Sequence, residues 1–121
     1  MSPICNEHGV YQAQERLELP RPVKGWKGGP IAEIDLAFIG PHWIWATGFQ
    51  LWGADCWGAC SPLCDRDSYR ASSREAAIDA ASAYLRRKVG PRAGECRDAA
   101  AIIGWLDTLV PDQLDLFGAA A

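Results

Sequence analysis

Three cysteines that could bind a metal lie close together in the middle of the chain, at Cys56, Cys60 and Cys64. Thiolates are the ligands that zinc and iron–sulfur clusters use in proteins. Structural zinc sites usually pair them as C-x2-C or C-x4-C, whereas the spacing here is C-x3-C-x3-C, with Gly58 and Pro62 between the thiols. The residues that could supply a fourth ligand are Cys5, His8 and Cys96. We favour free thiols that pack as small apolar groups, and expect no metal or other cofactor, with a metal site as the alternative.

Residues that could catalyse a reaction are few. The chain has two histidines, and a pair of Cys56 with His42 would form an activated thiol nucleophile. The residues around either position do not support that pair. The chain also lacks a G-x-S-x-G motif, an H-E-x-x-H motif and a glycine loop that binds phosphate. We therefore expect that the protein is not an enzyme.

Tryptophan is abundant, with six in the chain. Four of them lie within fifteen residues, at Trp43, Trp45, Trp52 and Trp57. Large rings fill the core of a thin domain efficiently, which is one interpretation. Tryptophan is also enriched at binding hot spots, which makes the same four residues candidates for a partner-binding surface.

The composition is that of one ordinary globular domain of 121 residues, with 49% hydrophobic and 22% charged residues. The formal net charge of −3 gives no basic excess, so direct binding of nucleic acid through its phosphates is not expected. No apolar run reaches the roughly 20 residues that span a bilayer, and the first residues lack the layout of a signal peptide. We expect a cytoplasmic protein with reduced thiols and no membrane partner.

The elements that must position these residues begin with a β-hairpin over 31–52. Apolar and polar residues alternate over 31–39, as in a half-buried strand, and Gly40-Pro41-His42 then forms a turn. The aromatic segment 43–51 provides the second strand. Residues 1–30 are rich in proline and glycine and predict an irregular arm, from which Val10–Leu19 could add a third strand.

The second half of the chain predicts a long loop over 53–72 and then two helices. A capping box of Ser72 and Glu75 begins a helix over 73–89, and Gly90-Pro91 ends it. A second helix is expected over 95–109. The predicted fold class is α+β, a small antiparallel sheet packed by two C-terminal helices. Its core is the even face of 31–39, part of 43–51 and the stripe of Ile78 and Leu85, within one domain over 31–110 that is followed by a tail over 111–121.

The tail contains the sequence Gln113, Leu114, Asp115, Leu116, Phe117. It resembles the pentapeptide by which bacterial polymerases and repair proteins bind the DNA sliding clamp, usually Gln-Leu-Ser/Asp-Leu-Phe, and it fits all five positions. The resemblance implies that the glutamine amide forms hydrogen bonds and that Leu116 and Phe117 fill an apolar pocket of the clamp. The alternative is that these apolar residues pack on the core of their own domain.

The chain as a whole resembles small proteins carried on proteobacterial plasmids and phages. The segments that carry this resemblance are WIWATGFQLWG, SSREAAIDAA and the tail. No activity follows from this resemblance. Our leading hypothesis is a non-catalytic accessory protein of a mobile element that acts by protein–protein contact, with the sliding clamp as its partner. The first alternative is an inhibitor of a defence complex, such as an anti-CRISPR protein that binds a CRISPR–Cas effector. The second is a small zinc- or cluster-binding module.

Overall fold

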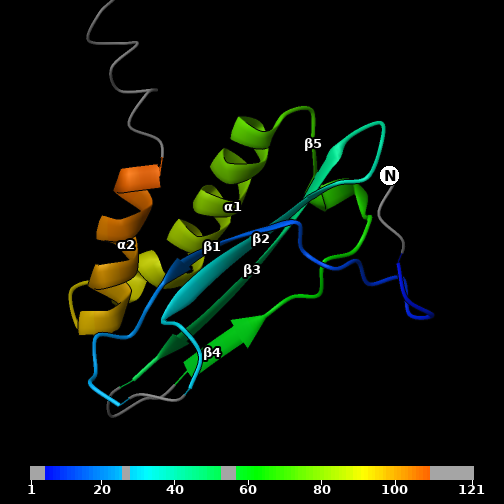
Figure 1. The fold of residues 1–121 in the computed structure, drawn as a ribbon. Coiled ribbons are helices and arrows are strands. Elements are labelled where there is room, and N and C mark those ends of the chain that lie inside the picture. Colours follow the sequence, from blue (N-terminus) through cyan, green and yellow to red (C-terminus); the bar gives the residue numbers. More distant parts are fainter. Residues whose placement is uncertain (1–4, 26–27, 53–56, 110–121) are drawn as a thin grey trace, which may run out of the picture.

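The computed structural model describes residues 5–25, 28–52 and 57–109. Four strands form an antiparallel sheet in the order β1-β2-β3-β4, and the short β5 also pairs with β3 (Figure 1). The elements are β1 (Glu15–Leu19), β2 (Ala32–Phe38), β3 (Trp43–Leu51), β4 (Trp57–Cys60), β5 (Arg70–Ala71), α1 (Arg74–Val89) and α2 (Arg97–Leu109), with 3-10 turns at Asp67–Tyr69 and Gly90–Arg92. The predicted α+β class is confirmed.

The predicted hairpin is formed by β2 and β3, which pair with Leu36 opposite Trp45. Between them lies the predicted turn, where Gly40 has a φ of 98°, a backbone conformation that glycine adopts without strain. The third strand that the arm could provide is β1, which pairs with β2 so that Leu17 lies opposite Ile34. Residues 15–19 of the arm therefore belong to the sheet.

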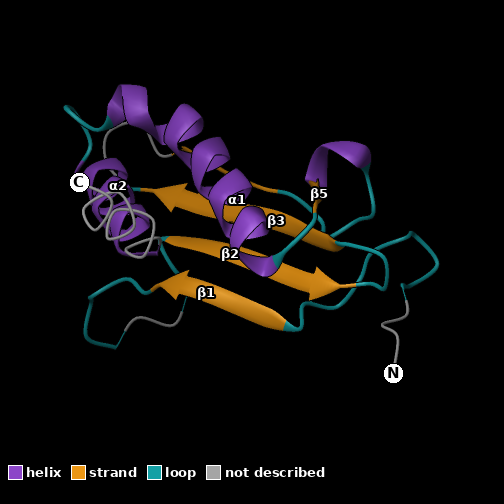
Figure 2. Ribbon diagram, turned by 90° about the horizontal axis from the view of Figure 1, so that it is seen from above, coloured by secondary structure: helices purple, strands orange, loops and turns teal. Residues whose placement is uncertain are grey.

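Both helices lie over one face of the sheet, and α1 crosses β2 and β3 obliquely (Figure 2). The core between these layers confirms most of the predicted one, because Ala32, Ile34 and Leu36 of β2 are buried together with the stripe of α1. Phe38, the last residue of the predicted even face, is instead 44% exposed at the end of β2. Its fully buried large side chains include Ile34, Leu36, Leu51, Leu85, Ile102 and Leu106. Neither helix of the described ranges is long and apolar enough to cross a membrane.

Two predictions of local structure were wrong. The segment 53–72 is not one long loop, because β4 and β5 both pair with β3. Glycine and alanine in β4 have weak strand propensity, and pairing with β3 decides their conformation. The residue that caps α1 is Ser73 rather than Ser72, since the Ser73 side chain accepts a hydrogen bond from the backbone N–H of Ala76 at 3.0 Å.

The sheet face away from the helices is covered at one end only. There Ala37, Ile44, Ala46 and Leu63 form a second, smaller cluster of buried residues. The N-terminal segment crosses this end, and Tyr11 donates a backbone hydrogen bond to Leu63 at 2.7 Å. Within the ranges that the structure describes, the remainder of the face carries polar side chains and no helix, and we call it the open face.

A buried ion pair joins the N-terminal segment to α2. Nη1 of Arg21 lies 3.0 Å from Oδ2 of Asp98, and these side chains are 5% and 10% exposed. The same Asp98 oxygen accepts the backbone N–H of Trp52 at 2.7 Å, while Arg21 also donates to the Gln50 carbonyl at 3.0 Å. The pair therefore holds three parts of the chain together: the segment after β1, the end of β3 and the first turn of α2.

Candidate functional site

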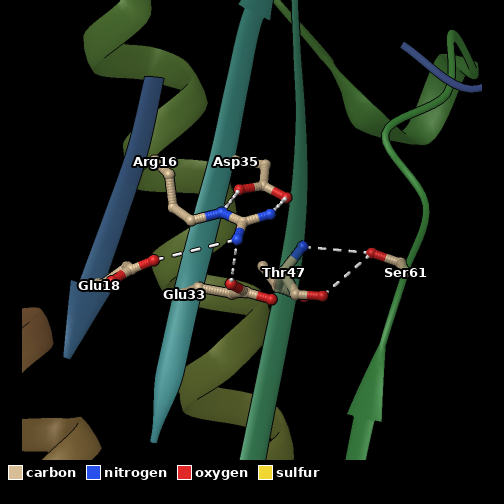
Figure 3. Close-up of polar contacts among 6 residues, drawn as sticks. All are labelled: Arg16, Glu18, Glu33, Asp35, Thr47 and Ser61. Atoms are coloured by element: carbon tan, nitrogen blue, oxygen red, sulfur yellow. Dashed lines mark hydrogen bonds and ion pairs between the residues drawn. The ribbon is translucent and has the colours of Figure 1, made fainter. Parts of the chain in front are cut away.

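Four charged side chains lie together on the open face, with the helices behind the sheet (Figure 3). Arg16 and Glu18 come from β1, and Glu33 and Asp35 come from β2. The strand register places Arg16 opposite Asp35 and Glu18 opposite Glu33. Like charges that face each other across two strands destabilise a sheet. The guanidinium of Arg16 has to offset that repulsion.

The contacts of Arg16 show how it does so. Its Nε lies 2.6 Å from Oδ1 of Asp35 and its Nη2 lies 3.2 Å from Oδ2, a two-point ion pair. Its Nη1 lies 3.2 Å from Oε2 of Glu33 and 3.9 Å from Oε1 of Glu18. The hydrogen bond with Asp35 is the main cause that raises the pKa of Arg16. Three carboxylates share one guanidinium, so this group is net negative when all are ionised.

A hollow of about 450 Å³ lies beside Glu33 over β3 and β4. Two glycines that line it lie in close contact with their neighbours. A Cβ at Gly48 would lie 2.8 Å from Oε1 of Glu33, and a Cβ at Gly58 would lie 2.7 Å from the Phe49 carbonyl oxygen. Both distances are shorter than real contacts of a Cβ atom. At Gly48, the Glu33 carboxylate therefore occupies space that a side chain at this position would need. Other residues that line the hollow include Pro30, Gln50 and Cys60.

The electrostatics of Glu33 favour a positive neighbour. Its side chain is 23% exposed, and burial raises its pKa, against the lowering effect of Arg16. The ion pair with Arg16 is made by Oε2, whereas Oε1 extends over Gly48 toward the hollow. A cation that entered the hollow would stabilise the ionised carboxylate, so the site is suited to an ammonium or a guanidinium group.

The candidate metal ligands of the cysteine segment are in two places. Cys60 lines the hollow on the open face, whereas Cys64 lies with Cys5 and His8 around a second hollow of about 310 Å³. Cys56 lies outside the described residues. Within residues 5–25, 28–52 and 57–109, no three histidine, cysteine or acidic side chains are placed to hold a metal ion.

We therefore expect purified protein to contain no stoichiometric metal. The physical reason is that Cys60 lines one hollow, Cys5 and Cys64 line the other, and Cys96 lies at neither, whereas zinc in structural sites needs four converging ligands. Elemental analysis of the purified chain measures this directly. About one zinc or several irons per chain would show that the metal alternative is correct.

His42 contacts a carboxylate rather than a described thiol. Its Nε2 lies 2.9 Å from Oδ1 of Asp65, and Nε of Arg70 lies 2.7 Å from the same oxygen. The hydrogen bond from Arg70, and then that from His42, lower the pKa of Asp65. These contacts attach the β2–β3 turn to the residues before β5. The thiol of the hypothetical Cys56–His42 pair lies outside the described residues.

The tryptophans divide between the core and the surface. Trp45 is only 4% exposed and packs edge-on against Tyr69, with 4.8 Å between ring centroids. Its interpretation as a partner-binding residue is wrong, because a ring buried under the helices cannot reach a partner. Trp43 is half-buried and packs on Phe38 at 5.6 Å, and Phe38 is 44% exposed.

The other two tryptophans each lie beside an arginine. Trp52 is 42% exposed, and the Arg21 guanidinium lies 4.4 Å from its ring centroid. Trp57 packs on Phe49 at 5.0 Å, and the Arg92 guanidinium lies 4.8 Å from it. Cation–π contacts of this kind fix the rings in place. These two residues keep some surface, which is compatible with a role in binding.

The sequence alone does not reveal the role of Arg16 or of the two glycines of the hollow. The signal that was present is the alternation of charge in Arg16-Leu17-Glu18 and in Glu33-Ile34-Asp35. Only the register between β1 and β2 shows that these charges face one another.

The pentapeptide Gln113–Phe117 lies outside the described residues, so its docking stays a prediction. Comparison of the chain with protein-family models, curated proteins and solved structures finds no match. A function can therefore be proposed only from the residues of this chain and from the geometry of its described part.

Proposed function

We propose that the chain is a non-catalytic accessory protein of a phage or plasmid that binds the DNA sliding clamp through Gln113–Phe117. The observation that carries the proposal is the agreement of this segment with all five positions of the clamp-binding pentapeptide. Leu116 and Phe117 would be the apolar anchors, and Gln113 would fix the orientation of the peptide by hydrogen bonds.

The position of the segment in the chain supports its use as a docking peptide. The buried stripe of α2 continues to Leu106, the helix ends at Leu109, and Gln113 follows four positions later. Leu116 follows Leu109 by seven positions, so the first anchor lies at most about 25 Å from the end of α2. A bound clamp would lie close to the C-terminal end of α2.

The test is to change both anchors in Leu116→Ala/Phe117→Ala. If the segment is a docking peptide, clamp binding is lost, because the apolar contacts with the clamp pocket are removed. The free energy of unfolding should change by less than about 0.5 kcal/mol, as for surface substitutions. A pull-down with purified clamp and a thermal melt of the same sample measure both quantities.

Two further variants control this experiment. Asp115→Ser keeps a residue that the pentapeptide accepts and should retain the clamp. Leu106→Ala removes a fully buried side chain and should lower the melting temperature while the folded protein still binds the clamp. If the wild type does not bind, and the double change instead costs several kcal/mol of stability, the tail packs on its own domain and the proposal is wrong.

A second candidate function is inhibition of a defence complex, such as a CRISPR–Cas effector. One observation favours it. The carboxylates of Glu18, Glu33 and Asp35 lie together on the open face and could bind a basic groove of such a complex. In an effector assay, the inhibition would have to persist in Leu116→Ala/Phe117→Ala and weaken when these carboxylates are neutralised.

A further inference from the structure

The strand β4 lies at an edge of the sheet, next to the hollow. It pairs with β3 on one side, and no other strand of the described residues pairs with it. An edge strand presents backbone N–H and C=O groups that an extended peptide can pair with. Gly58, Ala59 and Cys60 are exposed, and their small side chains leave the approach to this edge clear.

The register aligns one row of residues across the open face. Glu18 lies opposite Glu33, Glu33 opposite Gly48, and Gly48 opposite Cys60. A peptide strand added at β4 would continue this row with one of its own residues. That side chain would lie on the open face, with Cys60 and the bare Gly48 between it and the Glu33 carboxylate.

The distances along this row suit a long basic side chain. Strands in a sheet lie about 4.8 Å apart, so the added strand would be about 10 Å from β3. Oε1 of Glu33 extends over Gly48 of β3. An extended arginine or lysine side chain and its hydrogen bond together span that separation, because the absence of a side chain at Gly48 lets the Glu33 carboxylate lie over β3.

The charge of this part of the open face determines which kind of peptide can bind at the β4 edge. Three carboxylates and one guanidinium line this part of the face, and Arg16 already contacts all three carboxylates. A second cation would find a carboxylate oxygen directed at the hollow, whereas an acidic peptide or a nucleic-acid phosphate would be repelled.

We propose that the edge of β4 binds an extended segment of a partner protein by strand addition, and that an arginine or lysine of that segment reaches across β4 and pairs with the Glu33 carboxylate where it lies over Gly48. This surface is separate from the C-terminal pentapeptide and does not depend on clamp binding. It would give the protein a second partner with a basic, extended binding segment.

The probe is the peptide acetyl-Val-Arg-Val-Arg-Val-amide, titrated into ¹⁵N-labelled full-length protein. We expect amide shifts at Gly48 and at β4. The neutral peptide acetyl-Val-Gln-Val-Gln-Val-amide should bind about tenfold more weakly, and higher salt should weaken only the basic peptide. Glu33→Gln should reduce the affinity for the basic peptide to that for the neutral one.

A matched variant and a second variant make the result specific. Asp79→Asn removes one carboxylate from the exposed side of α1 and should bind the basic peptide like the wild type. Gly48→Ala introduces a Cβ 2.8 Å from Oε1 of Glu33, which is too close, so it should displace the carboxylate and weaken the basic peptide selectively. Spectra of each free variant verify that it is folded.

Three outcomes would overturn the proposal. The first is equal binding of the two peptides, and the second is unchanged binding by Glu33→Gln. The third is a wild-type protein that sediments as a dimer and pairs through two β4 edges. A second copy of the chain, and not a basic segment of a partner, would then bind at this edge.

Discussion

Asp98→Ala should lower the free energy of unfolding by about 3–5 kcal/mol, the usual effect of removing one partner of a buried ion pair. The change leaves the guanidinium of Arg21, which is 5% exposed, buried without the carboxylate that neutralises it. It also removes the acceptor of the Trp52 backbone N–H and a negative charge from the first turn of α2. Urea denaturation followed by circular dichroism measures the effect.

A surface ion pair provides the matched control for this experiment. Asp107 pairs with Arg86 at 2.5 Å, but these side chains are 62% and 38% exposed. Asp107→Ala should therefore cost less than about 1 kcal/mol. Equal effects of the two alanine changes would contradict the argument, because burial would then make no difference to the strength of the pair.

Leu85→Ala should lower the free energy of unfolding by about 2–5 kcal/mol. Leu85 is completely buried in the core between α1 and the sheet, so the change removes apolar contacts and leaves a cavity. Thermal and urea denaturation measure the loss. Lys88→Ala, on the exposed side of the same helix, is the control and should change stability by less than about 0.5 kcal/mol. An unchanged melting temperature for Leu85→Ala would contradict the assignment of this face to the core.

The parts of the fold that the sequence predicts are those with strong local signals. The alternation over 31–39 indicates β2 and its buried face, and Gly40 marks the turn that follows. The alanine-rich apolar pattern over 73–89 predicts α1, and the buried face of this helix is the predicted one. In each case neighbours within a few residues determine the structure, so a single sequence is sufficient.

The parts that the sequence does not predict depend on partners far along the chain. The segment Trp57–Cys60 has the composition of a loop and becomes a strand because β3 lies beside it. Likewise, Glu33 looks like an ordinary solvent-facing carboxylate until the register places it between Glu18 and Gly48. The candidate site arises from this register between strands. No motif within a short stretch of the sequence could therefore indicate the site.

The ion pair of Arg21 and Asp98 also has a consequence for the order of events during synthesis. Its partners are 77 residues apart, and at about 5–20 residues per second the ribosome adds Asp98 roughly 4–15 s after Arg21. Until then β1, β2, β3 and α1 can pack together, but the apolar surface that α2 will cover is exposed, and Arg21 lacks its carboxylate. A nascent chain halted before residue 98 would therefore be a substrate for chaperones and proteases, and the arrival of α2 is the step that completes the native protein.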